Sequence, residues 1–173
     1  DITERKRMVE ALRASEEQAR NLLEFQKKVI DTAVVWIDLL DREGNVTLWN
    51  RAAELISGYP REEVIGHMKI WEWLYSDPEY RDWIFGKAKE IIEKGERVEN
   101  LESTIKCKDG TLKTISWYTN NIVGKEGKPI GSIAVGIDVT ERKHLESKIE
   151  EYTKHLEQLV DERTKRLREA ERL

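Results

Sequence analysis

The stretch "DREGNVTLWNRAAELISG", residues 41–58, decides the fold because two kinds of secondary structure meet within it. "DREGN" supplies Asp, Gly and Asn, which tolerate the backbone angles of a hairpin turn, between the apolar runs "VVWIDLL" (34–40) and "NVTLWN" (45–50). "RAAELISG" (51–58) then predicts a short helix that ends at Gly58. The stretch therefore predicts a strand hairpin that leads directly into helical structure.

Two further helices are predicted after this point. Pro60 can occupy the first position of a short helix, because its missing amide proton is not needed there. The stretch at 76–95 predicts a longer helix, which Asp77 caps, Pro78 begins and Gly95 ends. One apolar stripe runs along it: Tyr80, Ile84, Ala88 and Ile91.

Three strands complete the central part of the chain. Short apolar runs at 98–107, 111–123 and 129–139 are separated by the Gly-containing turns "KDG" and "GKEGK". This spacing is typical of consecutive antiparallel strands. The order of two strands, several helices and three strands predicts an α+β fold.

Both ends of the chain predict long polar helices with a narrow apolar stripe. No Gly or Pro occurs between Thr3 and Ile30 or between Glu141 and Leu173. The N-terminal stripe, with 4-3-4-3 spacing, is Met8, Leu12, Ser15, Ala19 and Leu22. The C-terminal stripe, with 4-3-4-4-3-4-3 spacing, is Leu145, Ile149, Tyr152, Leu156, Val160, Arg163, Leu167 and Ala170. Such heptad-like stripes favour paired, coiled-coil-like helices and a homodimer, although single helices held by intrahelical ion pairs are the alternative.

The composition limits the classes of partner. Charged residues make up 37% of the 173 residues, yet the net charge is only −4, so the electrostatics favour neither nucleic-acid binding nor contact with a membrane surface. No apolar run is long enough to cross a bilayer. The lone Cys107 excludes an internal disulfide, fits a reducing compartment and leads to the interpretation that the protein is cytoplasmic.

The middle of the chain resembles the PAS domain, a sensor module of signalling proteins. The resemblance covers residues 31–143 and rests on "DREGNVTLWNRAAELISGYPREEVIGH" and "KDGTLKTISWYTNNIVGKEGKPIGSIAVGIDVTERK", separated by one long helix. The matching positions are Asn50, Gly58, Gly66, Gly110 and Asp138–Thr140. The resemblance implies a five-stranded antiparallel sheet with helices on one face, which often close over a small pocket.

The resemblance also divides the chain. Residues 1–30 would be a linker helix, 31–138 the PAS domain and 139–173 a signalling helix. "DITERK" (1–6) repeats "DVTERK" (138–143) almost completely and looks like the tail of a preceding PAS domain. The C-terminal helix resembles linkers that lead to histidine-kinase cores, so adjacent PAS and output domains are expected in the parent protein.

A set of large apolar residues borders the pocket that the resemblance implies. They are Trp36, Trp71, Trp73, Trp83, Ile84 and Trp117. These side chains could line a site for a flat small molecule, or they could fill the interior and leave no pocket. Small residues at Ser132, Ala134 and Gly136 permit the close approach of either a ligand or a packed helix.

The common PAS cofactors find little support in this sequence. A light-sensing flavin domain needs a reactive Cys within a sequence motif like "NCRFLQ". At the matching position this chain has "GHMKIWEWLY" (66–75), which contains no Cys. Haem-binding members supply an axial His from the long helix, and residues 78–94 contain none. We expect neither flavin nor haem, and no metal; the alternative to a domain without a ligand is an unknown small molecule.

The sequence shows no catalytic apparatus. His144 and His155 do not lie in the sequence motif of a kinase phosphoacceptor. No Gly-rich nucleotide-binding loop occurs, and no nucleophile–base pair is visible. We expect a regulatory module rather than an enzyme: a sensor or relay that controls an absent output domain. The alternative is a spacer without a ligand, which relays a signal from an upstream sensor.

The junction between the last strand and the C-terminal helix carries a local signal. Asp138 can cap the helix while Glu141, three residues later, bonds back in a variant of the capping box. We expect Asp138, Thr140 and Glu141 to form the place where a change in the sheet reaches the helix. The alternative is that they only cap a static helix.

Overall fold

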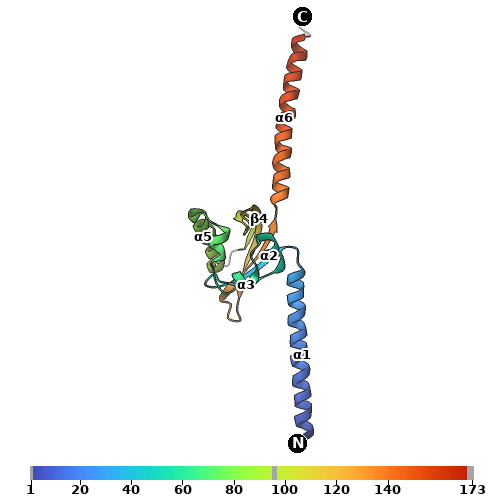
Figure 1. Cartoon of the computed structure of the whole chain (residues 1–173), viewed down its shortest axis with the longest axis vertical. Helices are drawn as coiled ribbons and strands as arrows, with labels where there is room; N and C mark the ends of the chain where they lie inside the picture. The colour runs from blue at the N-terminus through green and yellow to red at the C-terminus, as the bar shows by residue number, and fades with distance from the viewer. Residues whose placement is uncertain (1, 95–96, 171–173) are drawn as a thin grey trace.

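A central α+β unit, built from the strands and short helices, lies between two long helices. The computed structural model describes residues 2–94 and 97–170, with side chains for all of these except 91–93. Helix α1 (Ile2–Thr32) and helix α6 (Thr140–Ala170) leave the central unit in opposite directions, so the two ends of the chain lie far apart (Figure 1). Helix α1 extends two residues beyond the predicted boundary at 30.

The predicted antiparallel sheet is confirmed. Its strands are β1 (Trp36–Asp41), β2 (Val46–Trp49), β3 (Val98–Lys106), β4 (Leu112–Val123) and β5 (Pro129–Asp138). They lie in the order β2-β1-β5-β4-β3, and all neighbouring pairs are antiparallel. In the first hairpin the carboxylate of Asp41 accepts the amide protons of Glu43 (3.0 Å) and Asn45 (2.8 Å), which fixes the turn as the sequence predicts.

Four helices connect β2 to β3. They are α2 (Arg51–Ser57), α3 (Arg61–Val64), α4 (Ile70–Leu74) and α5 (Pro78–Lys94). Two predicted helix ends are confirmed. Gly58 adopts a left-handed conformation at the end of α2, and Asp77 accepts the amide proton of Tyr80 (2.9 Å) at the start of α5. Pro60 precedes α3 instead of starting it, because its ψ of 150° is extended. The predicted stop at Gly95 and the side chain of Ile91 lie outside the described residues.

One buried amide holds the start of the domain together. Asn50 is 1% exposed and lies directly before α2. Its Oδ1 accepts the backbone amide protons of Ile37 (2.9 Å) and Ala53 (3.0 Å). Its Nδ2 donates to the carbonyl oxygens of Ile30 (3.1 Å) and Val35 (2.9 Å). A single side chain thus connects the end of α1, the start of β1 and the start of α2.

Three indole rings dominate the core. Trp36 lies edge-on to Trp49 and to Trp117, with ring centroids 4.5 and 5.2 Å away. Gly136 of β5 makes room for this cluster, since a Cβ there would lie 2.7 Å from the ring of Trp117 and 2.8 Å from Ile115. At Gly136 the close neighbours are therefore side chains of the adjacent strand β4, and no packed helix is among the nearest atoms of the described residues.

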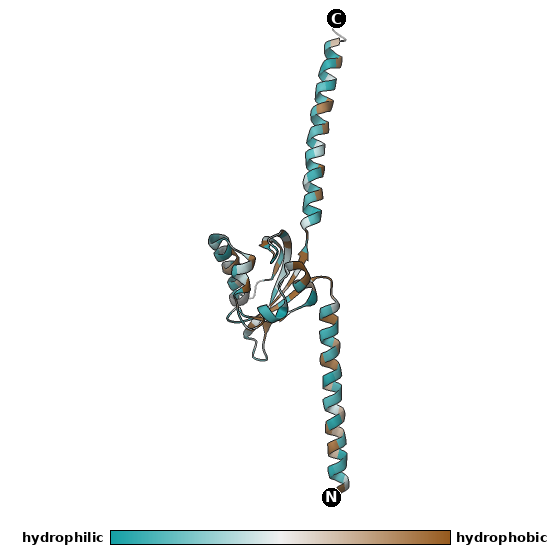
Figure 2. Ribbon diagram, viewed as in Figure 1, coloured by the Kyte–Doolittle hydropathy of each residue, from teal (hydrophilic) through white to brown (hydrophobic). Residues whose placement is uncertain are grey.

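The long helices differ sharply from the central unit in hydropathy. Figure 2 shows both as mainly hydrophilic ribbons with isolated hydrophobic turns, and none of their described residues is buried. Among the described residues, no helix has both the length and the apolar character that crossing a membrane requires.

The contacts of Asn50 predict a large loss of stability on truncation. We expect Asn50→Ala to lower the free energy of unfolding by about 3 kcal/mol, because buried backbone groups lose their partners. Urea denaturation followed by tryptophan fluorescence measures this change. Asn120→Ala, at an exposed position of β4, is the control and is expected to change stability by less than about 0.5 kcal/mol. Equal effects of the two substitutions would contradict the role of Asn50.

Candidate functional site

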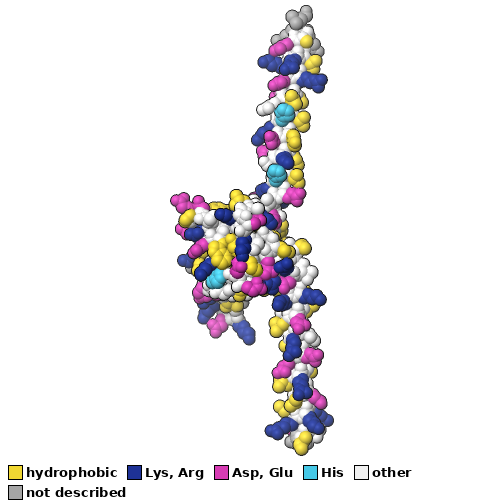
Figure 3. Space-filling model, viewed as in Figure 1, with side chains coloured by type: hydrophobic (Ala, Val, Ile, Leu, Met, Phe, Trp, Pro, Cys, Tyr) yellow, Lys and Arg dark blue, Asp and Glu magenta, His cyan; other side chains and the backbone are white. Residues whose placement is uncertain are grey.

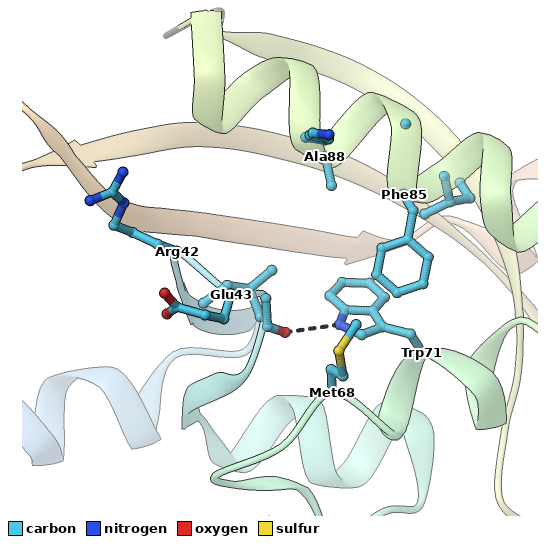
Figure 4. A pocket seen from close by; sticks show the side chains of 11 residues that line it. Arg42, Glu43, Met68, Trp71, Phe85 and Ala88 are labelled. Atoms are coloured by element: carbon cyan, nitrogen blue, oxygen red, sulfur yellow. Dashed lines mark hydrogen bonds between the residues drawn. The ribbon is translucent and has the colours of Figure 1, made fainter.

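A cavity of about 320 Å³ opens between the β1–β2 hairpin, α4 and α5 (Figure 4). Its lining residues are Leu40, Arg42, Glu43, Gly44, Met68, Trp71, Ile84, Phe85, Gly86, Ala88 and Lys89. The volume lies at the lower end of the roughly 300–1,000 Å³ typical of small-molecule sites. The cavity is thus the candidate binding pocket of the domain.

Apolar side chains form the wall of the pocket. Leu40 from the sheet and Ile84 from α5 are each 7% exposed. The indole of Trp71 is tilted against Phe85 with ring centroids 5.7 Å apart, and its Nε1 donates to the carbonyl oxygen of Gly44 (3.3 Å). Because this N–H already has a partner, Trp71 presents mainly an aromatic surface to the cavity.

The six predicted pocket residues do not form one site. Only Trp71 and Ile84 line the cavity. Trp36 and Trp117 lie in the core cluster, with their Nε1 atoms bonded to Asp38 (2.7 Å) and Ser103 (2.7 Å). The structure therefore supports the core-filling interpretation for these two residues, while ligand binding at the cavity stays a prediction.

The other two predicted tryptophans lie away from the cavity. Trp73 stacks on Tyr59 with ring centroids 5.2 Å apart, and Trp83 is 46% exposed and stacks on Tyr80. Sequence reasoning missed Met68 and Phe85, although Phe85 follows Ile84 directly in the predicted helix. Ile84 and Ala88 of the predicted apolar stripe do line the cavity, and Phe85 lines it beside them.

A buried acid lies on the inner face of the sheet. Asp38 is 2% exposed; its Oδ2 accepts the Trp36 Nε1 proton, while its Oδ1 has no partner in the described part of the chain. Burial raises the pKa of Asp38 to about 7, against the smaller opposing effect of the Trp36 hydrogen bond. The hydroxyl of Thr119 is likewise buried without a partner among the described residues. Ala134 pairs with both residues from the strand between them.

The junction between β5 and α6 is a small polar network. The Oδ1 of Asp138 accepts the amide proton (3.1 Å) and the hydroxyl proton (2.6 Å) of Thr140. The hydroxyl oxygen of Thr140 accepts in turn from the amide of Thr114 (2.9 Å), and Lys113 lies 3.3 Å from Asp138. The predicted capping box is wrong in one respect. Asp138 bonds to Thr140, two residues on, and the side chain of Glu141 is exposed.

The charge of Asp138 is stabilised in this network. Partial burial acts to raise its pKa, but the hydrogen bonds from Thr140 and the ammonium of Lys113 outweigh burial and hold the pKa below its usual value. A second ion-pair group joins the first turn of α6 to β3, where Glu102 lies 2.8 Å from Lys143 and 3.9 Å from Arg142. Lys113 and Glu102 were missed because their pairing depends on strand register.

The end of α1 is joined to the domain by a comparable contact. Arg61, just after Pro60, lies 2.9 Å from a carboxylate oxygen of Asp31 and 3.3 Å from Glu54. Asp31 also accepts the backbone amide proton of Arg51 (3.2 Å). Both long helices are therefore joined to the central unit by polar contacts.

No Cys or His residue is among the described residues that line the cavity. No group of three His, Cys, Asp or Glu residues lies close enough to hold a metal ion in the described ranges. Cys107 is buried, and its thiol donates to the carbonyl oxygen of Ile56 (3.3 Å). His144 and His155 are exposed on α6.

The raised pKa of Asp38 predicts a specific pH dependence. Its folded-state pKa lies above the ordinary 3.8, so its stabilising effect is complete below that value and is lost as the pH rises through about 7. Over this interval the unfolding free energy of the wild type, relative to that of Asp38→Asn, is expected to fall by about 1.4 kcal/mol per pH unit. Urea denaturation of both proteins at a series of pH values measures this difference in unfolding free energy. A difference that does not vary with pH would refute the assignment.

The network at Thr140 predicts that one hydroxyl holds the first turn of α6. We expect Thr140→Val to speed amide hydrogen exchange at residues 140–143 by about fivefold, as the loss of a helix cap does. Thr153→Val removes a hydroxyl that bonds only to the Ile149 carbonyl of the same helix (2.8 Å), and it serves as the matched control. No difference between the two variants would rule out a special role for Thr140.

Comparisons with known proteins agree with this geometry. The sequence profile of the PAS fold matches residues 30–144. The chain is 28% identical over 121 residues to the signal transduction histidine-protein kinase AtoS of Escherichia coli, and 30% identical over 146 residues to the two-component system protein A of Emericella nidulans. These matches cover 70% and 80% of this chain but only 19% and 20% of the relatives, so the chain spans about a fifth of their length.

A solved structure gives the same result for the fold. The PAS domain of a protein from Colwellia psychrerythraea matches with a TM-score of 0.59 at 23% identity, covering 69% of this chain and 98% of that domain. The strand order, the helices on one face of the sheet and the matched profile agree with one another. The chain belongs to the PAS fold family.

Proposed function

We propose that this chain is a sensory or signal-relay module, which forms a homodimer and passes a conformational signal through α6 to an output domain. The observation that carries the proposal is the row of apolar side chains that α6 leaves exposed. Leu145, Ile149, Tyr152, Leu156 and Val160 are between 51% and 67% exposed. Figure 3 shows hydrophobic side chains along one side of this helix.

A second copy of α6 is the simplest cover for this row. Its heptad-like spacing suits a parallel helix pair, in which each apolar residue packs between residues of the partner helix. Helix α1 supports the same arrangement, because Leu12 and Leu22 are 61% and 57% exposed and Ala19 is also exposed. The dimer seam would therefore run along both flanking helices.

Signal transfer would use the junction at Thr140. The start of α6 is bonded to β5 through Asp138 and to β4 through Thr114 and Lys113, so a shift of β4 or β5 changes how α6 leaves the domain. Coupling of this kind needs two states of the chain that differ in the arrangement of α6 and in their affinity for the signalling ligand or partner. The partly exposed contacts at the junction are weak enough to rearrange.

The output domain is proposed to be a histidine kinase. The two relatives are named as a histidine-protein kinase and a two-component system protein, and each is far longer than this chain. In this view the fragment is regulatory and not itself an enzyme, carries neither haem nor flavin, acts in the cytoplasm, and lies beside further domains in a longer protein.

An alternative function is relay without a ligand. The packing of Trp36, Trp49 and Trp117 favours it, because these rings fill the centre of the domain. A small molecule that copurifies with the chain would favour direct sensing. Native mass spectrometry separates the two functions, since only a sensor would carry a bound mass that is lost on denaturation.

The proposed seam predicts that charge on α6 separates the chains. We expect the double variant Ile149→Asp and Leu156→Asp to raise the dissociation constant of the dimer by at least about 100-fold, because a charge would be buried without a partner. Sedimentation velocity measures the constant. Lys154→Asp introduces the same charge on the opposite side of α6 and should leave the dimer intact. A wild-type chain that sediments as a monomer would contradict the proposal.

A further inference from the structure

The pocket between the hairpin and α5 combines an apolar interior with charged side chains of both signs. The interior contacts come from Leu40, Trp71, Ile84 and Phe85. The charges come from Arg42 and Glu43, consecutive residues of the hairpin, and from Lys89 on α5. In Figure 4 the side chains of Arg42 and Glu43 lie at the same edge of the pocket, with their charged ends directed away from Trp71. A ligand that fits this distribution has an apolar body and a polar end.

The two hairpin charges are available to such a ligand. Arg42 and Glu43 are exposed, and neither side chain forms an ion pair within the described part of the chain. The turn itself is fixed by other groups, since Asp41 accepts the amide protons of Glu43 and Asn45. The side chains of Arg42 and Glu43 are therefore not needed to hold the hairpin together.

We propose that this pocket binds a free α-amino acid with an apolar side chain. The carboxylate of the ligand pairs with the guanidinium of Arg42, which can donate two hydrogen bonds to it, and the ammonium pairs with Glu43. The side chain of the ligand enters the apolar cavity. The inference rests on the proposed sensory function and names the class of molecule that is sensed.

The cavity wall suits an aromatic or branched aliphatic side chain. Trp71 and Phe85 offer ring surfaces to the ligand. The Trp71 N–H is already bonded to the carbonyl oxygen of Gly44, so it does not need a polar group of the ligand as a partner. Ala88 projects from α5 into the pocket (Figure 4), and its small size leaves the space open. The roughly 320 Å³ volume accommodates a single side chain of this kind.

Three probes with one aromatic body separate the contributions of the charges. Phenylalanine carries both charged groups, 3-phenylpropionate lacks the ammonium, and phenethylamine lacks the carboxylate. Binding is followed by NMR through the indole N–H of Trp71, identified by its loss in Trp71→Phe. Each analogue lacks one of the two ion pairs. We therefore expect phenylalanine to bind about fivefold tighter than 3-phenylpropionate and about fivefold tighter than phenethylamine.

Variants assign each charge to its partner. Arg42→Gln should remove the advantage of phenylalanine over phenethylamine, and Glu43→Gln its advantage over 3-phenylpropionate. Ala88→Leu should abolish binding of all three probes by filling the cavity. Lys125→Gln and Glu126→Gln change an equivalent charge pair in the exposed β4–β5 turn, and they should leave all affinities unchanged.

Two results would overturn the proposal. One is equal affinity for the three probes, or affinities unaffected by Arg42→Gln and Glu43→Gln. The other is an absence of binding tighter than about 10 mM for phenylalanine, leucine and tryptophan. Neither result bears on the dimer or on the junction at Thr140, so the proposed relay function is tested separately by sedimentation.

Discussion

The four hydrogen bonds of Asn50 are the constraint on which the rest of the structure depends. They fix the end of α1, the start of β1 and the first turn of α2 around one buried amide. Because β1 is paired with β5, the same contact sets the position of the strand that leads into α6. Asn50 bonds directly to the end of α1 and reaches α6 indirectly through β1 and β5. A displacement at one long helix can therefore be passed through these strands to the other.

The positions of the aromatic side chains follow from this frame. Trp36 is the first residue of β1 and lies between Trp49 and Trp117, which come from strands on either side. Their packing closes the centre of the domain and displaces the open cavity toward the hairpin and α5. The filled core and the pocket are therefore compatible, although they looked like alternatives in the sequence.

The sequence predicted the strands and long helices well because each has a local signal. Gly58 ends α2 and Asp77 caps α5, and both effects need only neighbouring residues. The pocket depends instead on how α5 lies against the hairpin and α4, so Phe85 was missed although the apolar stripe with Ile84 and Ala88 was predicted. Lys113 and Glu102 were missed for a related reason, because their partners lie on other elements.

Asp38 was missed for a different reason. Its alternation with Trp36 and Leu40 places it on the inner face of β1, but an acid at such a position is unexpected without a visible partner. Sequence patterns describe where apolar residues gather. They carry no information about the surroundings of a buried polar atom, which for Asp38 include Trp36 and the paired strand at Ala134.

The central claim is that the junction at Thr140 sets the arrangement of α6 in a dimer. It is tested most directly by the distance between spin labels at position 165 of the two chains, attached to Lys165→Cys and measured by pulsed electron paramagnetic resonance. Cys107 is buried, which directs labelling to the introduced residue. The account predicts one narrow distance distribution in the wild-type background and a shifted or broadened one with Thr140→Val. Identical distributions, or no interchain distance at all, would contradict it.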